Sequence, residues 1–223
     1  MRKYRLIVSV LALTCALAIA GLAGCGGSSS SNTTASGNAS SSTSTSSASA
    51  SSASSTNVAD DKAAIVADIN KVIGTSVSKE TLEKGLRADD NVQKYITYGF
   101  DVSAYAENMS NIMKLEILDI DVDGDKAVAN VRLIMPNFND ESVEQLMNDA
   151  LQDLAAGRDV QAMAEDEQIA LVMSATSVVL ANPNFPTASF DFSIDYAKKN
   201  GEWIMVDPAG VDSLMTQFAE TLT

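Results

Sequence analysis

The chain has 223 residues and a formal net charge of −14, and it contains no histidine. This charge argues against nucleic acid as a ligand, because binding to a phosphate backbone requires clustered Lys and Arg side chains. Without histidine the chain lacks the commonest general base and the commonest metal ligand, so a binding role is favoured over catalysis.

The N-terminus has the charged, apolar and small-residue order of a secretory signal peptide. Basic residues precede an apolar run from Leu6 to Ala20, which is interrupted at Thr14. A single membrane-spanning anchor is the alternative, and it fits less well because this run is short.

The run Leu22-Ala23-Gly24-Cys25 resembles the lipobox of bacterial lipoproteins. In that family the Cys thiol receives a diacylglycerol, and the signal peptide is cut just before it. The resemblance implies that residues 1–24 are a lipoprotein signal peptide. It also implies that acylated Cys25 holds the protein on the lipid bilayer, at the extracytoplasmic face of the cell membrane.

A Ser-rich segment follows, and residues 26–57 contain no charged residue and none larger than Asn. Such a segment has nothing to bury and cannot offset the entropy lost on ordering. We therefore predict a disordered tether over residues 25–58 and a single globular domain over residues 59–223.

The domain begins with a region that predicts helices, residues 59–112. Ile65, Ile69 and Ile73 recur at helical spacing, and Gly74 is expected to follow the helix in a left-handed conformation. Ser78 and Asp101 are expected to cap two further helices.

The pattern then changes to the period of two that is typical of strands. Asp123-Gly124 predicts a two-residue type I′ turn, which would place Val122 opposite Asp125. A bulge is expected near Ile117, where the parity of the apolar residues changes. One face of this hairpin then collects the apolar side chains Leu118, Ile120, Val122, Ala127, Ala129, Val131 and Leu133.

Two further helices and a second hairpin are expected. Asp140 and Gly157 bound the first helix. Residues 166–181 are apolar and predict a buried helix, with a strand as the alternative because of their β-branched content. Asn200-Gly201 predicts another type I′ turn, which pairs Lys199 with Glu202, and a last helix follows Pro208.

These elements predict an α+β fold, with an antiparallel sheet built from two hairpins, at about 114–135 and 187–207, packed on helices. The run from Tyr98 to Ala129 and the later Asn200-Gly201-Glu202-Trp203 are similar to uncharacterised bacterial lipoprotein domains of the cystatin-like and nuclear-transport-factor-like superfamily. The resemblance implies a curved sheet wrapped around a helix, often with a cavity. It does not fix the function, because this superfamily hosts both enzymes and binding domains.

An acidic motif in the first hairpin matches the first half of an EF-hand calcium loop. It consists of Asp119, Asp121, Asp123, Gly124 and Asp125. The twelfth position would be Asn130 rather than a bidentate Glu, and the flanking residues are strand-like. A hairpin with a solvated acidic face explains the same residues, so we predict no metal site.

Aromatic and methionine residues could fill a core or line a pocket. We expect Met109 and Met113 to fill the core rather than to bind a soft metal, because the domain has no nearby His or Cys. Five aromatic residues are interpreted first as core and second as a ligand pocket: Tyr95, Tyr98, Tyr105, Tyr196 and Trp203.

The sequence therefore predicts a lipid-anchored, non-catalytic accessory domain that binds an envelope protein or a small apolar ligand, without a cofactor. The first alternative is a hydrolase or isomerase that uses a buried Asp or Glu in a cavity, with Asp101 and Glu107 as the acids that the pattern cannot place on a solvent face. The second alternative is a structural component of the cell envelope.

Overall fold

A computed structural model describes residues 53–222 of the chain. The predicted signal peptide, Cys25 and the part of the tether before Ala53 lie outside the described residues. The described elements are, in chain order, α2 (Ala53–Val72), the 3-10 helix η2 (Gly74–Val77), α3 (Lys79–Arg87), α4 (Asp90–Thr97), α5 (Val102–Ile112), β1 (Lys114–Asp123), β2 (Lys126–Pro136), α6 (Glu141–Ala155), the 3-10 helix η3 (Val160–Ala162), α7 (Glu165–Leu180), β3 (Thr187–Lys199), β4 (Glu202–Met205) and α8 (Pro208–Thr221).

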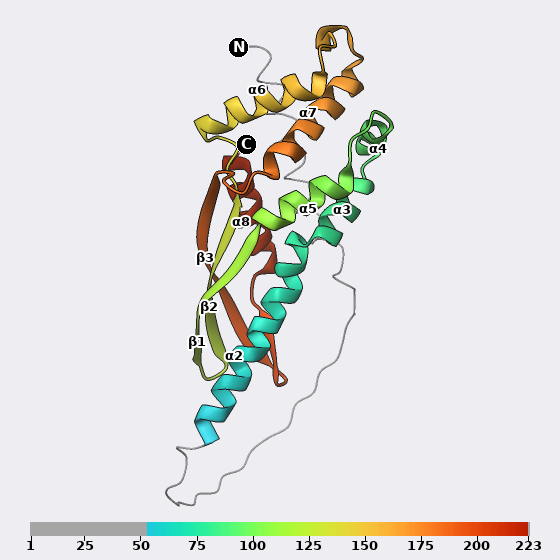
Figure 1. Ribbon diagram of the computed structural model, residues 1–223. Helices are drawn as coiled ribbons and strands as arrows, with labels where there is room; N and C mark the ends of the chain where they lie inside the picture. Colours follow the sequence, from blue (N-terminus) through green and yellow to red (C-terminus); the bar gives the residue numbers. More distant parts are fainter. Residues whose placement is uncertain (1–52, 223) are drawn as a thin grey trace, which may run out of the picture.

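The protein has an α+β fold with one open antiparallel sheet, in the strand order β1-β2-β3-β4. The two predicted hairpins are present and join through β2 and β3. We call the sheet face that carries Phe190, Tyr196 and Trp203 the inner face. Both α2 and α8 contact it: Tyr196 and Trp203 bond to α2, and Phe190 stacks on Phe218 of α8. Figure 1 shows the helices on this side of the sheet and above it.

Side chains alternate along the strands as predicted. Ala127, Ala129, Val131 and Leu133 are buried on the inner face, and the residues between them reach the outer face. Leu118 differs from the prediction, because it is 46% exposed. The pairing shifts between Ile117 and Asp119, so Leu118 is the extra residue of the predicted bulge and has no place on the inner face.

The second hairpin has the predicted register. Lys199 pairs with Glu202, and Asn200 and Gly201 have φ values of 54° and 87°. Positive φ at both central residues is the signature of the type I′ turn.

For the first hairpin, the predicted register is wrong by two residues. The turn residues are Gly124 and Asp125, and Val122 pairs with Ala127 instead of Asp125. Gly124 has a φ of 61°, and Asp125 does not have a positive φ. Glycine as the first of two turn residues is typical of type II′, which needs only one residue with positive φ. In the observed register Val122 pairs with Ala127, an apolar partner on the inner face, whereas the predicted register would place it opposite the Asp125 carboxylate.

The helices follow the predicted signals with two exceptions. Ser78, Asp101 and Asp140 cap α3, α5 and α6. Residues 166–181, for which both a helix and a strand were considered, form the helix α7. Gly74 does not adopt the predicted left-handed conformation, because the chain continues directly into η2. Helix α2 begins at Ala53, before the predicted domain boundary at residue 59, since extending a formed helix fixes only one further residue per hydrogen bond.

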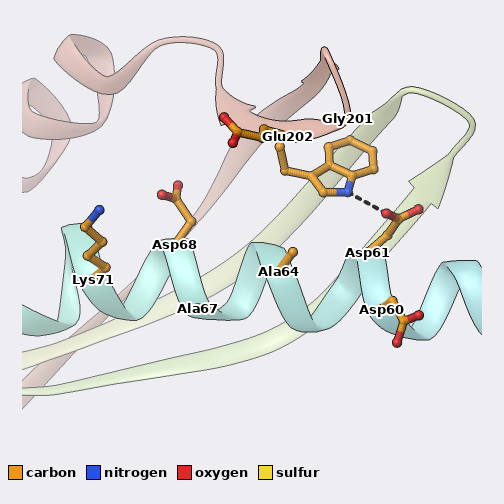
Figure 2. Close-up of a pocket in the computed structure, with 9 residues that line it drawn as sticks. Asp60, Asp61, Ala64, Ala67, Asp68, Lys71, Gly201 and Glu202 are labelled. Carbon is orange, nitrogen blue, oxygen red and sulfur yellow. Dashed lines mark hydrogen bonds between the residues drawn. The ribbon is translucent and has the colours of Figure 1, made fainter.

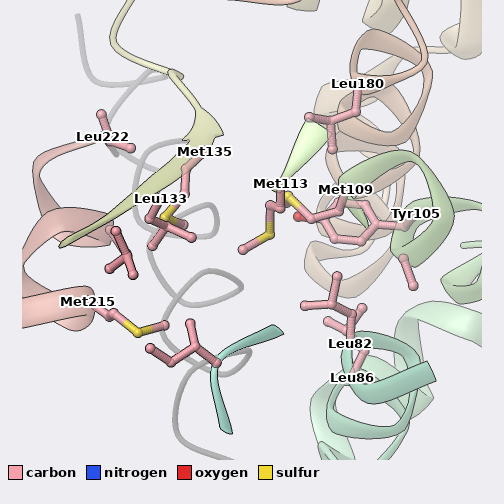
Figure 3. Close-up of a cluster of buried hydrophobic side chains, with 14 of the residues drawn as sticks. Leu82, Leu86, Tyr105, Met109, Met113, Leu133, Met135, Leu180, Met215 and Leu222 are labelled. Atoms are coloured by element: carbon pink, nitrogen blue, oxygen red, sulfur yellow. The ribbon is translucent and has the colours of Figure 1, made fainter. Parts of the chain in front are cut away.

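The core between the sheet and the helices is rich in methionine. Met109 and Met113 are both buried among apolar side chains, which confirms that they fill the core. Figure 3 shows them facing Leu82, Tyr105, Leu180 and, across the core, Met135 and Leu133 of β2.

Candidate functional site

A groove of about 430 Å³ lies between α2 and the β3–β4 turn. This volume is within the range of small-ligand pockets. Its walls come from one side of α2 and from the tip of the hairpin, as Figure 2 shows. The lining residues are Asp60, Asp61, Ala64, Ala67, Asp68, Lys71, Gly201, Glu202 and Trp203.

Two aspartates of α2 bond to the sheet at this groove. They are seven residues apart, which places them on the same side of a helix two turns apart. Asp61 Oδ1 accepts hydrogen bonds from Lys198 Nζ at 2.6 Å and from Trp203 Nε1 at 2.9 Å. Asp68 Oδ2 accepts one from the Tyr196 hydroxyl at 3.0 Å. These contacts hold α2 against the end of the inner face.

The same contacts shift the pKa values of Asp61 and Tyr196. The hydrogen bonds from Lys198 and then Trp203 lower the pKa of Asp61. Burial, with a smaller contribution from the Asp68 carboxylate, raises the pKa of Tyr196 well above its usual range. Asp61 is therefore charged and Tyr196 neutral near pH 7, and both act as fixed hydrogen-bonding groups.

Lys198 also interacts with the aromatic ring at the groove. Its Nζ lies 5.4 Å from the centre of the Trp203 ring, within the range of a cation–π contact. A carboxylate and an aromatic face together hold an ammonium group here. The Lys198 ammonium group therefore illustrates the kind of cation that can bind beside Asp61 and Trp203.

Three charged side chains of the groove are available for a ligand. Asp60, Glu202 and Lys71 are exposed, and among residues 53–222 none of them forms a hydrogen bond or an ion pair through its side chain. Two carboxylates against one ammonium leave the free part of the groove negative. It is suited to a ligand that carries positive charge.

The five predicted pocket residues do not come together. Trp203 lines the groove, and Tyr196 does not line it but donates a hydrogen bond to the lining residue Asp68. Tyr95, Tyr98 and Tyr105 lie in or next to α4 and α5, at the other end of the domain in Figure 1. Burial raises the pKa of Tyr95, and Tyr105 packs edge-on against Phe100, with ring centres 5.6 Å apart. Tyr98 is 48% exposed.

The acids singled out from the sequence have structural contacts or lie on a solvent face. Asp101 caps α5, and Glu107 forms an exposed ion pair with Lys79 at 2.7 Å. The run from Asp119 to Asp125 forms the end of β1 and the turn of a hairpin, in the corrected register. Within the described part of the chain, no three side chains of the metal-binding types converge as a metal site would require.

Sequence reasoning missed Asp61, Asp68 and Lys198. A signal was present, because Asp61 and Asp68 fall on the same helical stripe as Ile65 and Ile69. A charge inside an apolar stripe indicates a buried partner, and here the partners lie more than a hundred residues away, beyond the reach of local patterns.

No protein-family model, curated protein or solved structure matches the chain. Among residues 53–222, no helix combines the length and the apolar character needed to cross a membrane.

Proposed function

We propose that the protein is a lipid-anchored binding protein, displayed on the extracytoplasmic face of the cell membrane through acylated Cys25 and the Ser-rich tether. We base the binding role on the groove between α2 and the β3–β4 turn. Its free charges favour a polar, cationic ligand, such as an amine or a basic segment of an envelope protein, over the small apolar ligand that the sequence suggested.

A binding role explains the groove better than catalysis does. Asp61 and Asp68 are used as acceptors that attach α2 to the sheet. Catalysis by a carboxylic acid needs a carboxyl group with a raised pKa at the reacting position. Asp212 is a carboxyl group whose pKa is raised by burial, and it lies on α8, outside the groove lining.

The cystatin-like arrangement is part of this proposal. A long helix, α2, precedes a four-stranded antiparallel meander and packs on one of its faces. Helices α6 and α7 form an insertion between β2 and β3, where the simplest version of that fold has a short connection. These features support the resemblance at the level of element order.

Replacement of the predicted lipid attachment site tests the anchoring. We expect the Cys25→Ala protein to remain uncleaved or to lose its lipid, because two acyl chains give lasting attachment at about 0.8 kcal/mol per buried methylene. The measurements are the membrane-bound fraction and the incorporation of a labelled fatty acid. Cleavage and membrane retention equal to those of the parent would overturn the anchoring.

Fluorescence of the single tryptophan tests the groove. A titration with tri-lysine should change Trp203 emission, and tri-glutamate should not. We expect Glu202→Gln to weaken tri-lysine binding about two- to fivefold, the range of one exposed ion pair. Glu144→Gln, at an exposed position of α6, is the matched control and should bind like the parent. Equal binding by both variants, or no response to tri-lysine, would contradict the proposed ligand.

A further inference from the structure

We propose that the outer face of the sheet docks a second partner, a polypeptide segment with apolar side chains flanked by Lys or Arg. This surface is separate from the groove and does not depend on the function proposed for it. We call it the outer patch and define it by Val128, Ile204 and Val206 with Asp119, Asp121 and Asp195.

The outer patch has an exposed apolar centre. Val128, Ile204 and Val206 are 38%, 44% and 60% exposed. They lie together because Val128 pairs with Asp195, and the Val206 N–H donates to the Asp195 carbonyl at 2.8 Å. Ile204 lies in the next row, opposite Ala197. In Figure 1 the described helices lie on the inner side of the sheet or above it, and none covers this face.

Carboxylates without partners border this centre. Asp119 and Asp121 are alternate residues of β1, so their side chains lie on the same face about 7 Å apart. Asp121 and Asp195 flank Val128 directly, on either side of β2. Among the described residues, none of these three carboxylates has an ion pair or a side-chain hydrogen bond.

The rest of the same face shows the contrast. Arg132 donates to Asp191 from Nε at 2.6 Å and from Nη2 at 2.8 Å, a two-point ion pair between neighbouring strands. The Ser193 hydroxyl likewise donates to Asn130 at 2.7 Å. These four side chains are thus satisfied by neighbours within the sheet, whereas the carboxylates of the outer patch are not.

The charge of the patch selects among occupants. The three carboxylates outnumber the one ammonium beside them, Lys126, which is exposed two residues before Val128 on the same face. The patch is therefore negative, so a second copy of the chain and an anionic lipid surface would both be repelled. A basic segment would neutralise Asp119, Asp121 and Asp195 while its apolar side chains cover Val128, Ile204 and Val206. The small extent of the patch fits one segment of a partner rather than a large interface.

The experiment uses a short peptide of alternating Lys and Val, with the Glu and Val counterpart as the control peptide. Methyl signals of Val128, Ile204 and Val206 in the folded protein are followed by NMR. We expect these signals to shift with the basic peptide only. Binding should weaken at least about fivefold in Asp121→Asn/Asp195→Asn, and it should fall between about 50 and 200 mM salt.

Two control variants and a second test variant make the result specific. Glu116→Gln, on β1 opposite Arg132 and outside the outer patch, should bind like the parent. Asp60→Asn should leave the methyl shifts unchanged, since Asp60 lies on α2 at the groove. Val128→Ser/Ile204→Ser should also weaken binding, and the aspartate variant tests the proposal independently if that protein does not fold. Shifts spread over all acidic surfaces, parent-like binding by the aspartate variant, or a dimer formed through the patch would each overturn it.

Discussion

The two faces of the sheet have opposite relations to the rest of the molecule, although the same strands form both. On the inner face Val131 and Leu133 have no exposed surface, because α2, α8 and the core methionines cover them. On the outer face the intervening side chains meet solvent, and Ile204 and Val206 are exposed although they are apolar. The comparison teaches that one face holds the fold together, while the other is free to interact with a partner.

The largest expected effect is on the inner face. Leu133→Ala removes a fully buried side chain and should lower the free energy of unfolding by about 3 kcal/mol. Val128→Ala, on the outer face of the same strand, should change it by no more than about 0.5 kcal/mol. The measurement is urea denaturation of both variants. Losses of similar size at the two positions would show that the outer face is covered as well.

An intermediate effect is expected at the β3–β4 turn, which sets the register between these two strands and therefore which side chains lie on each face. Gly201 has a φ of 87°, and no atom lies within 4 Å of a Cβ built on it, so only backbone strain opposes a side chain there. Gly201→Val should lower the free energy of unfolding by about 1–2 kcal/mol. Asn200→Gly keeps a residue that accepts positive φ and should retain parent stability in the same denaturation measurement. A stable Gly201→Val protein would mean that the turn does not hold the register.

The smallest effect on stability is expected at Asp61, where α2 contacts Lys198 and Trp203 at the end of the inner face. The pKa of Asp61 is lower in the folded protein than its ordinary value of 3.8. The folded state therefore prefers the charged form, and its stabilising contribution is present above about pH 4 and is lost as the pH falls below that value.

Asp61→Asn removes this contribution at all pH values. We expect the variant to have a lower Tm than the parent at pH 7 and a smaller further loss between about pH 5 and pH 2. Asp60→Asn, at the neighbouring exposed position, is the matched control and should keep the parent's pH dependence. Parallel Tm curves for parent and Asp61→Asn would show that the contact with Lys198 and Trp203 does not hold in solution.

The fold was largely predictable because its signals are local. Alternation along β2 and the turn at Asn200-Gly201 identified the buried face and one register directly. The first turn was misplaced because Asp123-Gly124 and Gly124-Asp125 are both acceptable two-residue turns, and the two registers bury the same side chains. Only the pairing across the strands distinguishes them.

The candidate site was less predictable because it is assembled from distant segments. Trp203 and Tyr196 were identified as aromatic candidates, but a position in the sequence does not show that Asp61 and Asp68 reach them. The expectation of one aromatic pocket grouped residues by type, whereas α4 and the β3–β4 turn lie at opposite ends of the domain.

The insertion between β2 and β3 has a consequence for the order in which the protein is assembled. The two strands pair from Lys126–Ala197 to Pro136–Thr187, yet residues 137–186 separate them in the chain, and the Asn137 N–H donates to the Pro186 carbonyl at 2.9 Å. Each hairpin closes over two residues and can form within microseconds, whereas the central pair must close a long loop. During synthesis the first hairpin therefore emerges well before β3, and the free edge of β2 has no partner until α6, α7 and β3 have left the ribosome.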